Sequence, residues 1–273
     1  TGCTSVANTS GDGIKFESAA YCVAQSCSVT ANPGSGFAVT GASHHDTVAN
    51  SYCVGNSGAN FYISGSYNTF DSNYVTISGW EANILVIGQW DTGDSNTISN
   101  NRVSAPGSGR VNIKLTQNAC GNVIDGNEIY SGEAQGIYVD ATCNGNGTII
   151  RNNEVHSNTS YAIYIGSGSN CYDLDISGNE IHSNSSYGIL LDANANCQRA
   201  VINDNTICTN TNIGVLATNC GSHDVTFSGN TVRSNSGRGL VLTYGSNWSI
   251  DTNSFISNSG HGVHLDGYCT GAR

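Results

Sequence analysis

Methionine is absent from this chain of 273 residues, and proline and lysine occur only twice each. Charged residues make up 11% of the sequence and give a net charge of −11. Because nucleic acids are bound through clustered Lys and Arg, this composition predicts no nucleic-acid partner. No apolar run approaches the roughly 18 residues of a membrane-spanning helix, and no signal peptide is visible, so we expect no transmembrane segment. The missing initiator methionine predicts a processed or excised chain.

With only Pro33 and Pro106, strand ladders would run almost uninterrupted, and no stretch shows a sustained helical period. Instead an apolar-x-x-Asn-x-apolar pattern recurs, as in Ile124…Asn127-Glu128-Ile129. Its asparagines lie 23 to 28 residues apart and are Asn73, Asn101, Asn127, Asn153, Asn179, Asn205, Asn230 and Asn253. A fixed period in the range of about 20–50 residues predicts a stack of similar supersecondary units.

A second pattern, Gly-Ile-x-Val or a close variant, follows these asparagines by about ten residues. It occupies 13–16, 36–39, 136–139, 162–165, 188–191, 214–217, 239–242 and 262–265. Such short alternation is a strand signal, and the Gly, Asn and Ser between the runs favour turns. Eleven strands of this kind from Ile14 to Val263 predict about eleven turns of about 25 residues, with strands pairing in parallel at about 4.8 Å.

The repeated asparagines are predicted to turn the corners between strands, because Asn tolerates the left-handed backbone region. Their side-chain amides would hydrogen-bond from turn to turn as a ladder. A second ladder is predicted five residues later and contains Asn158, Asn184, Asn210, Asn235 and Asn258. We assign these asparagines a structural role and no catalytic one.

These repeats resemble the right-handed parallel β-helix of the pectate-lyase-like superfamily over residues 3–269. The resemblance implies an all-β fold, with one parallel β-helix (β-solenoid) domain over residues 1–273. That superfamily includes polysaccharide lyases, glycoside hydrolases, sugar epimerases, tailspikes, adhesins and structural surface proteins. Its enzyme motifs are not matched here. The Asp-Pro-His of alginate epimerases is absent, and Gly260-His261-Gly262 lacks the other residues of polygalacturonase sites.

Eleven cysteines favour an oxidising, extracellular compartment. Five are expected at one corner of successive turns: Cys120, Cys143, Cys171, Cys197 and Cys220. Adjacent turns could place their Cα atoms within the roughly 4.4–6.8 Å of a disulfide, for example in Cys120–Cys143 and Cys171–Cys197. The alternative is a column of reduced, half-buried thiols. Asn-x-Ser/Thr sequons in turns make Asn8, Asn146 and Asn247 candidate glycosylation sites.

The outer face of the Gly-Ile-x-Val strands carries a candidate ligand site. Lys114, Tyr138 and Tyr164 would stack on successive turns, with Asp140 and Asp192 beside them. Aromatic rings beside carboxylates suit sugars, so the tyrosines are candidate glycan-binding residues, and Lys114 and the two aspartates are candidate catalytic residues. Two turns would separate the aspartates by about 9.6 Å, at the outer limit of the roughly 6.5–9.5 Å of inverting glycosidases. The alternative is an exposed face on which tyrosines pack together and Lys114 pairs with Asp140.

A second outer face would stack Glu154-Val155-His156 on Glu180-Ile181-His182. Two carboxylates and two imidazoles could hold a divalent cation, so Glu154, His156, Glu180 and His182 are a candidate metal site. The alternative is a solvated ladder in which the imidazoles offset the repulsion between glutamates. No cofactor is required in either case.

No capping helix is visible at either end, and Cys3 and Cys269 fall at comparable corners of the first and last turns. Bare ends predict either excision from a longer or polymerising chain or head-to-tail stacking into a filament, with a Cys269–Cys3 link between subunits. The sequence therefore favours a secreted, extracellular or cell-surface structural protein that self-associates end to end. The alternative is a polysaccharide lyase, a glycoside hydrolase or a glycan-binding module, with a polysaccharide as its partner.

Overall fold

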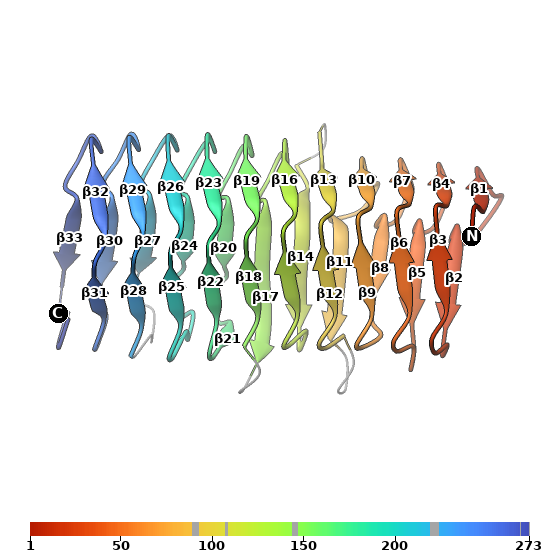
Figure 1. Ribbon diagram of the computed structural model, residues 1–273, viewed down its shortest axis with the longest axis horizontal. Coiled ribbons are helices and arrows are strands. Elements are labelled where there is room, and N and C mark those ends of the chain that lie inside the picture. Colours follow the sequence, from red (N-terminus) through yellow and green to blue (C-terminus); the bar gives the residue numbers. More distant parts are fainter. Residues whose placement is uncertain (89–92, 107–108, 144–146, 219–223, 268, 273) are drawn as a thin grey trace.

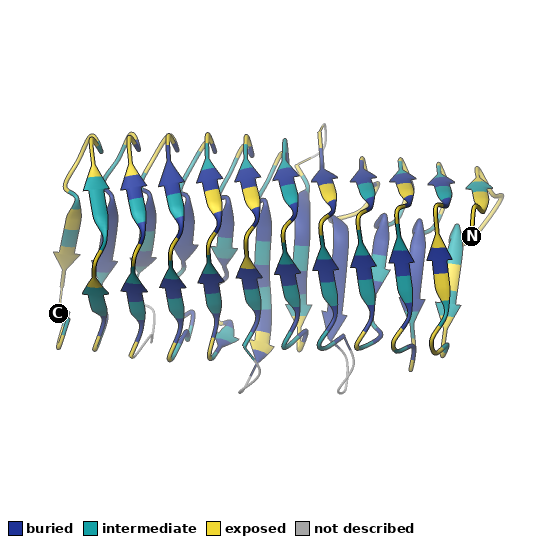
Figure 2. Ribbon diagram, viewed as in Figure 1, coloured by how far each residue is buried: buried dark blue, intermediate teal, exposed yellow. Residues whose placement is uncertain are grey.

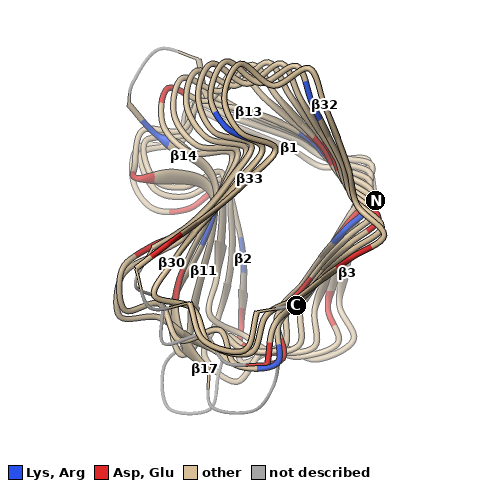
Figure 3. Cartoon of the chain, turned by 90° about the vertical axis from the view of Figure 1, so that its left-hand side faces the viewer, with Lys and Arg blue, Asp and Glu red and all other residues tan. Residues whose placement is uncertain are grey.

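The predicted all-β solenoid is confirmed by the computed structural model, which describes residues 1–88, 93–106, 109–143, 147–218, 224–267 and 269–272. Short strands wind around one axis and stack into three parallel sheets (Figure 1), and the described residues contain no helix. Seen along the axis, the turns superimpose, and the sheets form walls around the interior (Figure 3). The chain ends lie at opposite ends of the stack (Figure 1).

The strands of each sheet follow one another by one turn in the described part of the chain. The first sheet contains β1 (Thr4–Val6), β4 (Ser28–Thr30), β7 (Tyr52–Val54), β10 (Tyr74–Thr76), β13 (Arg102–Ser104), β16 (Glu128–Tyr130), β19 (Glu154–His156), β23 (Glu180–His182), β26 (Thr206–Cys208), β29 (Thr231–Arg233) and β32 (Ser254–Ile256). The second sheet contains β2 (Ile14–Glu17), β5 (Phe37–Thr40), β8 (Phe61–Ile63), β11 (Ala82–Gly88), β14 (Val111–Gln117), β17 (Ile137–Cys143), β20 (Ile163–Ile165), β24 (Ile189–Leu191), β27 (Val215–Thr218), β30 (Leu240–Thr243) and β33 (Val263–Asp266), and β21 (Asn170–Cys171) pairs with the end of β17. The third sheet contains β3 (Val23–Gln25), β6 (Thr47–Ala49), β9 (Thr69–Asp71), β12 (Thr97–Ser99), β15 (Val123–Asp125), β18 (Ile149–Arg151), β22 (Asp175–Ser177), β25 (Val201–Asn203), β28 (Thr226–Ser228) and β31 (Ser249–Asp251).

The core is a set of apolar columns that run parallel to the axis. Ile124, Ile150 and Ile176 occupy the centres of β15, β18 and β22, are paired in register, and are all 0% exposed. Burying each such side chain stabilises the fold by about 1.5–3 kcal/mol. Figure 2 shows the same alternation in most strands, with a buried centre and more exposed flanks. One turn alone could not bury these side chains, which is why the repeat must stack.

The corners are turned by residues with left-handed backbone, but these are not the ladder asparagines, so that part of the prediction is wrong. The positive φ belongs to the residue before each asparagine, for example Gly126 (φ 67°) before Asn127 and Asn152 (φ 55°) before Asn153. This residue bends the chain and aims the next side chain inward. Gly and Asn recur there because they tolerate the left-handed region.

Both predicted asparagine ladders are confirmed, and Asn127 is typical of them. Its Nδ2 donates to the carbonyl of Ile98 at 2.8 Å and to Oδ1 of Asn153 at 2.9 Å. Its Oδ1 accepts from the backbone N–H and the side-chain amide of Asn101 at 2.8 and 3.0 Å. The ladder therefore satisfies polar groups in a dry corner, where an unpaired group would be costly.

The second ladder extends further towards the N-terminus than the sequence predicts. Gly132 takes the ladder position on the turn before Asn158, and the Nδ2 of Asn112 reaches Oδ1 of Asn158 directly at 3.0 Å. Side-chain amide hydrogen bonds continue the chain of asparagines through Asn83, Asn60, Asn56 and Asn32. The substitution by glycine hides this continuity from the repeat pattern.

Candidate functional site

The predicted outer column of the second sheet is confirmed by the strand register. Lys114 of β14 pairs with Tyr138 of β17, and Tyr138 pairs with Tyr164 of β20. Leu85 of β11 precedes Lys114 in this column. Sequence reasoning missed Leu85, which lies in the run Ile84-Leu85-Val86. The structure thus brings the candidate glycan-binding residues together on one face.

Four tyrosines form what we call the tyrosine cluster: Tyr138, Tyr161, Tyr164 and Tyr187. The rings of Tyr138 and Tyr164 stack with centroids 4.8 Å apart, and those of Tyr161 and Tyr187 stack at 5.3 Å. Tyr161 also lies 5.2 Å from Tyr164, which joins the two stacks. All four rings are half-buried, so each is held in place and still offers surface to solvent. Sequence reasoning missed Tyr161 and Tyr187, although each immediately precedes the first residue of the strand pattern.

The carboxylate of Asp192 is tied to this cluster. Its Oδ2 accepts a 2.6 Å hydrogen bond from the hydroxyl of Tyr164, and its Oδ1 accepts from the backbone N–H of Ala193 at 2.7 Å. Burial, followed by the hydrogen bond to Asp192 and the charge of that carboxylate, raises the pKa of Tyr164 far above its ordinary value. The phenol of Tyr164 therefore stays protonated at neutral pH and acts as a hydrogen-bond donor.

Asp140 lies beside Tyr138, two residues further along the same strand, β17. Burial raises the pKa of Tyr138, and the charges of Asp140 and Asp192 and a hydrogen bond to Asp140 raise it further. Gly166 occupies the equivalent position on the turn between Asp140 and Asp192. Its N–H donates to the carbonyl of Val139, and the N–H of Asp192 donates to the carbonyl of Ile165. A Cβ at Gly166 would come 2.8 Å from the ring of Tyr138. The missing side chain thus leaves room for the ring between two carboxylates that lie two turns apart.

The alternative from the sequence, in which Lys114 pairs with Asp140, is wrong. Its Nζ forms a 2.8 Å salt bridge with Glu81 and lies 5.3 Å from the centroid of the Tyr138 ring. Only 15% of the Lys114 side chain is exposed. Its ammonium is therefore held between a carboxylate and an aromatic face, where both attractions act on it.

The aromatic surface continues towards the N-terminus beyond Lys114. Tyr62 of β8 stacks on Trp80 with ring centroids 5.8 Å apart, and Trp80 is 46% exposed. Tyr62 and Tyr138 both pack on a small apolar cluster on the outer face of the second sheet, which contains Ala59, Ala82, Leu85, Ile87 and Val111. Sequence reasoning missed Trp80, which precedes its strand in a turn. The face thus carries apolar and aromatic side chains over several successive turns.

The predicted metal residues stack on the first sheet as a ladder of rings and carboxylates. The rings of His156 and His182 are nearly parallel, with centroids 5.0 Å apart. His182 Nε2 lies 3.2 Å from Oε1 of Glu154, and Glu154 pairs in register with Glu180. No three His, Cys, Asp or Glu side chains in the described residues are grouped so that they could hold a metal ion. The imidazoles lie near the Glu154 carboxylate, as the ladder alternative expects, and a bound cation stays a prediction.

The cysteine column forms one disulfide among the described residues, Cys120–Cys143, with Cα atoms 5.2 Å apart. Cys171 pairs in register with Cys143 but keeps a free, buried thiol, so the pairing with Cys197 is not formed. Burial, with a further contribution from the charge of Asp140, raises the pKa of the Cys171 thiol to about 12. Cys220 lies outside the described residues. Cys3 is exposed, and Cys269 is half-buried.

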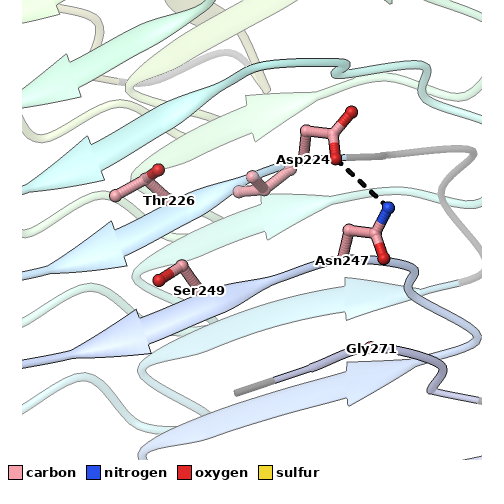
Figure 4. A pocket seen from close by; sticks show the side chains of 6 residues that line it. Asp224, Thr226, Asn247, Ser249 and Gly271 are labelled. Atoms are coloured by element: carbon pink, nitrogen blue, oxygen red, sulfur yellow. Dashed lines mark hydrogen bonds between the residues drawn. The ribbon is translucent and has the colours of Figure 1, made fainter.

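Two of the three candidate glycosylation sites can be placed. Asn8 is exposed, and its amide donates to Oγ of Ser5 at 3.0 Å. Asn247 is also exposed and donates to Oδ1 of Asp224 at 3.2 Å, at the rim of a polar recess of about 370 Å³. Figure 4 shows this recess beside the third sheet, with Thr226 and Ser249 on neighbouring strands. Asn146 lies outside the described residues.

A further stack of rings lies near the N-terminus, on the corner between the second and third sheets. His45 is sandwiched between Tyr21 and Tyr67, with centroids 5.2 and 5.5 Å away. All three residues have positive φ, so each is a left-handed residue of its corner. A recess of about 320 Å³ beside them is lined by Gly41, Ala42, Ser43, His44, His45, Ser66 and Tyr67.

A family model described as a right handed beta helix region matches residues 84–198 and 117–273, which together span 84–273. No curated protein sequence gives a significant match. The described residues contain no helix long and apolar enough to cross a membrane.

Solved structures with a similar fold share little sequence with this chain. The surface adhesin PfbA of Streptococcus pneumoniae has a TM-score of 0.62 and 12% identity, over 95% of this chain and 73% of the adhesin. The periplasmic alginate epimerase AlgG has a TM-score of 0.59 and 14% identity, over 90% of this chain and 64% of the epimerase. The Dettilon tailspike protein has a TM-score of 0.57 and 13% identity, over 97% of this chain and 60% of the tailspike. At such low identity the likeness establishes the fold alone, and the chain spans less than two thirds of the epimerase and of the tailspike.

Proposed function

Because this chain belongs to the right-handed β-helix family, we propose that it is an extracellular or surface protein that binds a polysaccharide along the outer face of its second sheet. The observation that carries this proposal is the tyrosine cluster, in which Tyr138, Tyr161, Tyr164 and Tyr187 lie together on one face. Flat aromatic rings pack against the apolar faces of sugar rings, and their hydroxyls bond to sugar hydroxyls. A polymer running parallel to the axis would meet aromatic rings on the successive turns that carry the cluster.

The setting of the aromatic rings supports binding of an extended ligand. Stacking on one another holds the tyrosine rings in fixed positions, so little conformational entropy is lost when a ligand packs on them. Tyr62, Trp80 and the apolar cluster beside them would lengthen the contact surface towards the N-terminus. Binding through a long, pre-organised face suits a polymer better than a single sugar, because each turn adds a small contribution.

The state of the two aspartates favours binding over catalysis. Both oxygens of Asp192 already accept hydrogen bonds, and Asp140 lies close enough to Tyr138 to raise the pKa of its phenol. A general base must be free to reach a water molecule or a substrate proton, and the phenol of Tyr164, with its raised pKa, is a poor base at neutral pH. For the protein to act as an enzyme, one aspartate would have to give up its contact with its tyrosine. Polysaccharide cleavage that is lost in Asp140→Ala or Asp192→Ala would establish that alternative.

Isothermal titration with a panel of soluble polysaccharides tests the proposal. Tyr161→Ala should weaken the binding of whichever glycan binds by about fivefold or more, since an aromatic contact contributes about 1 kcal/mol. Tyr52→Ala is the matched control, because Tyr52 stacks on Tyr74 at 5.1 Å on the first sheet, away from the proposed face. The proposal is wrong if no glycan in the panel binds, or if the two variants bind equally well.

An extracellular or surface location is part of the proposal. The Cys120–Cys143 disulfide supports it, because disulfides persist in oxidising compartments. The structural neighbours include a surface adhesin and a periplasmic enzyme, which is consistent with such a location. Mass spectrometry of the secreted protein, before and after reduction, would show whether Cys120 and Cys143 are oxidised in the native source.

Head-to-tail assembly, which the sequence predicts, remains a second candidate. Cys3 precedes the first strand of the stack and Cys269 follows the last, and neither forms a disulfide in the described structure. The two residues are therefore too far apart to pair within one chain and available to pair between chains. Electron microscopy of the native protein should show fibres of uniform width that shorten under reductant. Monodisperse particles under both conditions would contradict the filament.

A further inference from the structure

The proposed face carries more negative than positive charge. Glu81, Asp140 and Asp192 lie on or beside it, and Lys114 is committed to the salt bridge with Glu81. Neither Asp140 nor Asp192 takes part in a salt bridge with a described residue. Two carboxylates therefore face the proposed ligand without a cationic partner from this part of the chain.

The phenols of the tyrosine cluster respond to this negative field. After burial, the charges of Asp140, Asp192 and Glu81 raise the pKa of Tyr138. The pKa of Tyr161 is raised by burial first and then by the charges of Tyr187 and Asp192. Each shift has the direction expected where a further negative charge is disfavoured. A polymer with a carboxylate on every sugar would meet the same repulsion.

Lys114 shows how a cation is accommodated on this face. Its ammonium lies between the carboxylate of Glu81 and the ring of Tyr138. One turn beyond Tyr138 a ring and a carboxylate again lie together, because the hydroxyl of Tyr164 donates a hydrogen bond to Asp192. The column position that follows Tyr164 is Leu190, so the chain supplies no ammonium there. This second carboxylate and ring would accept an ammonium from a ligand.

We propose that the polysaccharide is one with free amino groups, such as a polymer of 2-amino sugars, and not a polyuronate. The inference rests on the proposed function and adds the chemical class of the ligand. The protonated amines would pair with Asp192 and Asp140, and the sugar rings would pack on Tyr138, Tyr161 and Tyr187. A charged amine also attracts the electron-rich faces of these rings. The repeating ligand charge would match carboxylates that recur along the axis.

Titration with three oligomers of equal length tests this class: glucosamine, N-acetylglucosamine and galacturonate. Glucosamine oligomers should bind most tightly, and acetylation, which removes the charge, should weaken binding by about tenfold. Galacturonate oligomers should not bind measurably. Raising the salt from about 10 to about 150 mM shortens the Debye length from about 30 to about 8 Å, so it should weaken only the glucosamine complex.

A charge-neutralising variant separates the electrostatic contribution from the aromatic one. Asp192→Asn should weaken the glucosamine complex about fivefold or more, and should weaken it more than it weakens the binding of N-acetylglucosamine oligomers. Asp266→Asn is the matched control, because Oδ1 of Asp266 accepts from the N–H of Gly267 at 2.8 Å, as Oδ1 of Asp192 does from that of Ala193. Asp266 lies at the last turn, away from the tyrosine cluster.

The outcomes distinguish the two proposals. Tighter binding of galacturonate, or equal binding of charged and acetylated oligomers at low salt, would overturn the ligand class and leave glycan binding intact. Equal loss in Asp192→Asn for charged and acetylated oligomers would also overturn it, because the carboxylate would then act through the Tyr164 ring. Failure of every oligomer and every polysaccharide to bind would overturn the proposed function itself.

Discussion

The hydroxyl of Tyr164 donates a 2.6 Å hydrogen bond to the carboxylate of Asp192, which lies on the next turn of the solenoid. The bond links two successive turns on the outer face, just as the asparagine ladders link them at the corners. It fixes the ring of Tyr164 between Tyr138 and Tyr161. Asp192 is therefore both part of the proposed site and a support for its aromatic surface.

Removing the charge of Asp192 should lower the pKa of Tyr164 towards the ordinary tyrosine value of about 10. Burial raises the pKa of Tyr164, and the bond to Asp192 and its charge raise it further. In Asp192→Asn, the pKa of Tyr164 is raised only by burial and by the smaller effects of Tyr138 and Tyr161. Titration of phenolate absorbance should show one tyrosine ionising at lower pH than in the wild type. An unchanged titration curve would mean that the hydrogen bond is not formed in solution.

The same shift predicts how stability depends on pH. The pKa of Tyr164 is higher in the folded protein than in the unfolded chain. Its contribution to stability is therefore complete below pH about 10 and is lost as the pH rises through the folded value. Tyr164→Phe should make unfolding less dependent on pH above about 10. Chemical denaturation at several alkaline pH values would measure this.

The fold was predictable because the asparagines of the first ladder face inward, and an apolar replacement would leave buried polar groups unpaired. Their spacing therefore repeats visibly, from Asn73 to Asn253. The left-handed residue before each one only needs to tolerate its backbone, so it varies among Gly126, Asn152 and Asp204. Because this residue varies and the asparagine after it does not, the sequence pattern predicts the corner at the asparagine.

The site was less predictable, because its contacts join residues with no common spacing. Lys114 and Glu81 form a salt bridge across 33 residues, and Glu81 lies in a turn outside the repeated column. Tyr161 and Tyr187 also precede the strand pattern, where alternation gives no information on side-chain direction. The outer column itself could be predicted, since alternation along β14, β17 and β20 fixes which residues face out.

Gly166→Ala should weaken ligand binding without unfolding the protein. The added Cβ would lie 2.8 Å from the ring of Tyr138, so the ring must shift. The ring is the far end of a half-exposed side chain and can move at small cost, whereas its stack on Tyr164 would be disturbed. We expect a change in stability below about 1 kcal/mol and a loss of several-fold in glycan affinity. Unchanged affinity with a displaced ring would exclude Tyr138 from the binding surface.

Removing the disulfide with Cys120→Ser and Cys143→Ser should destabilise the solenoid. The bridge closes a loop with a sequence separation of 23 residues, which corresponds to about 3 kcal/mol of unfolded-state entropy. For a chain of this size the melting temperature should fall by roughly 6–12 °C. Reductant should have the same effect on the wild type.

Cys171 provides the control for the disulfide. Its thiol is free and buried, and its pKa is raised to about 12 by burial and by Asp140. Cys171→Ala should cost only about 1 kcal/mol, and Cys171 should resist alkylation until the protein unfolds, whereas the exposed Cys3 reacts at once. Rapid alkylation of Cys171 in the folded protein would contradict the packing of this corner.

Asparagines in the middle of a ladder should matter more than those at its end. The Nδ2 of Asn153 donates to the carbonyls of Ile124 and Arg151 and to Oδ1 of Asn179, and its Oδ1 accepts two bonds from Asn127. Asn153→Ala leaves several of these buried groups without partners, at about 1–3 kcal/mol each. We therefore expect a loss of about 3 kcal/mol or more in the free energy of unfolding.

Asn253 is the matched control at the last turn of the same ladder. It is half-buried, and within the described part of the chain its Nδ2 donates to the carbonyl of Phe227 alone, at 2.8 Å. Water can replace part of the hydrogen bonding that it provides to Asn230. Asn253→Ala should therefore cost about 1 kcal/mol, well below the cost of Asn153→Ala. Urea denaturation of both variants measures the difference. Equal losses would show that the ladder stabilises each turn locally rather than through the buried stack of amides.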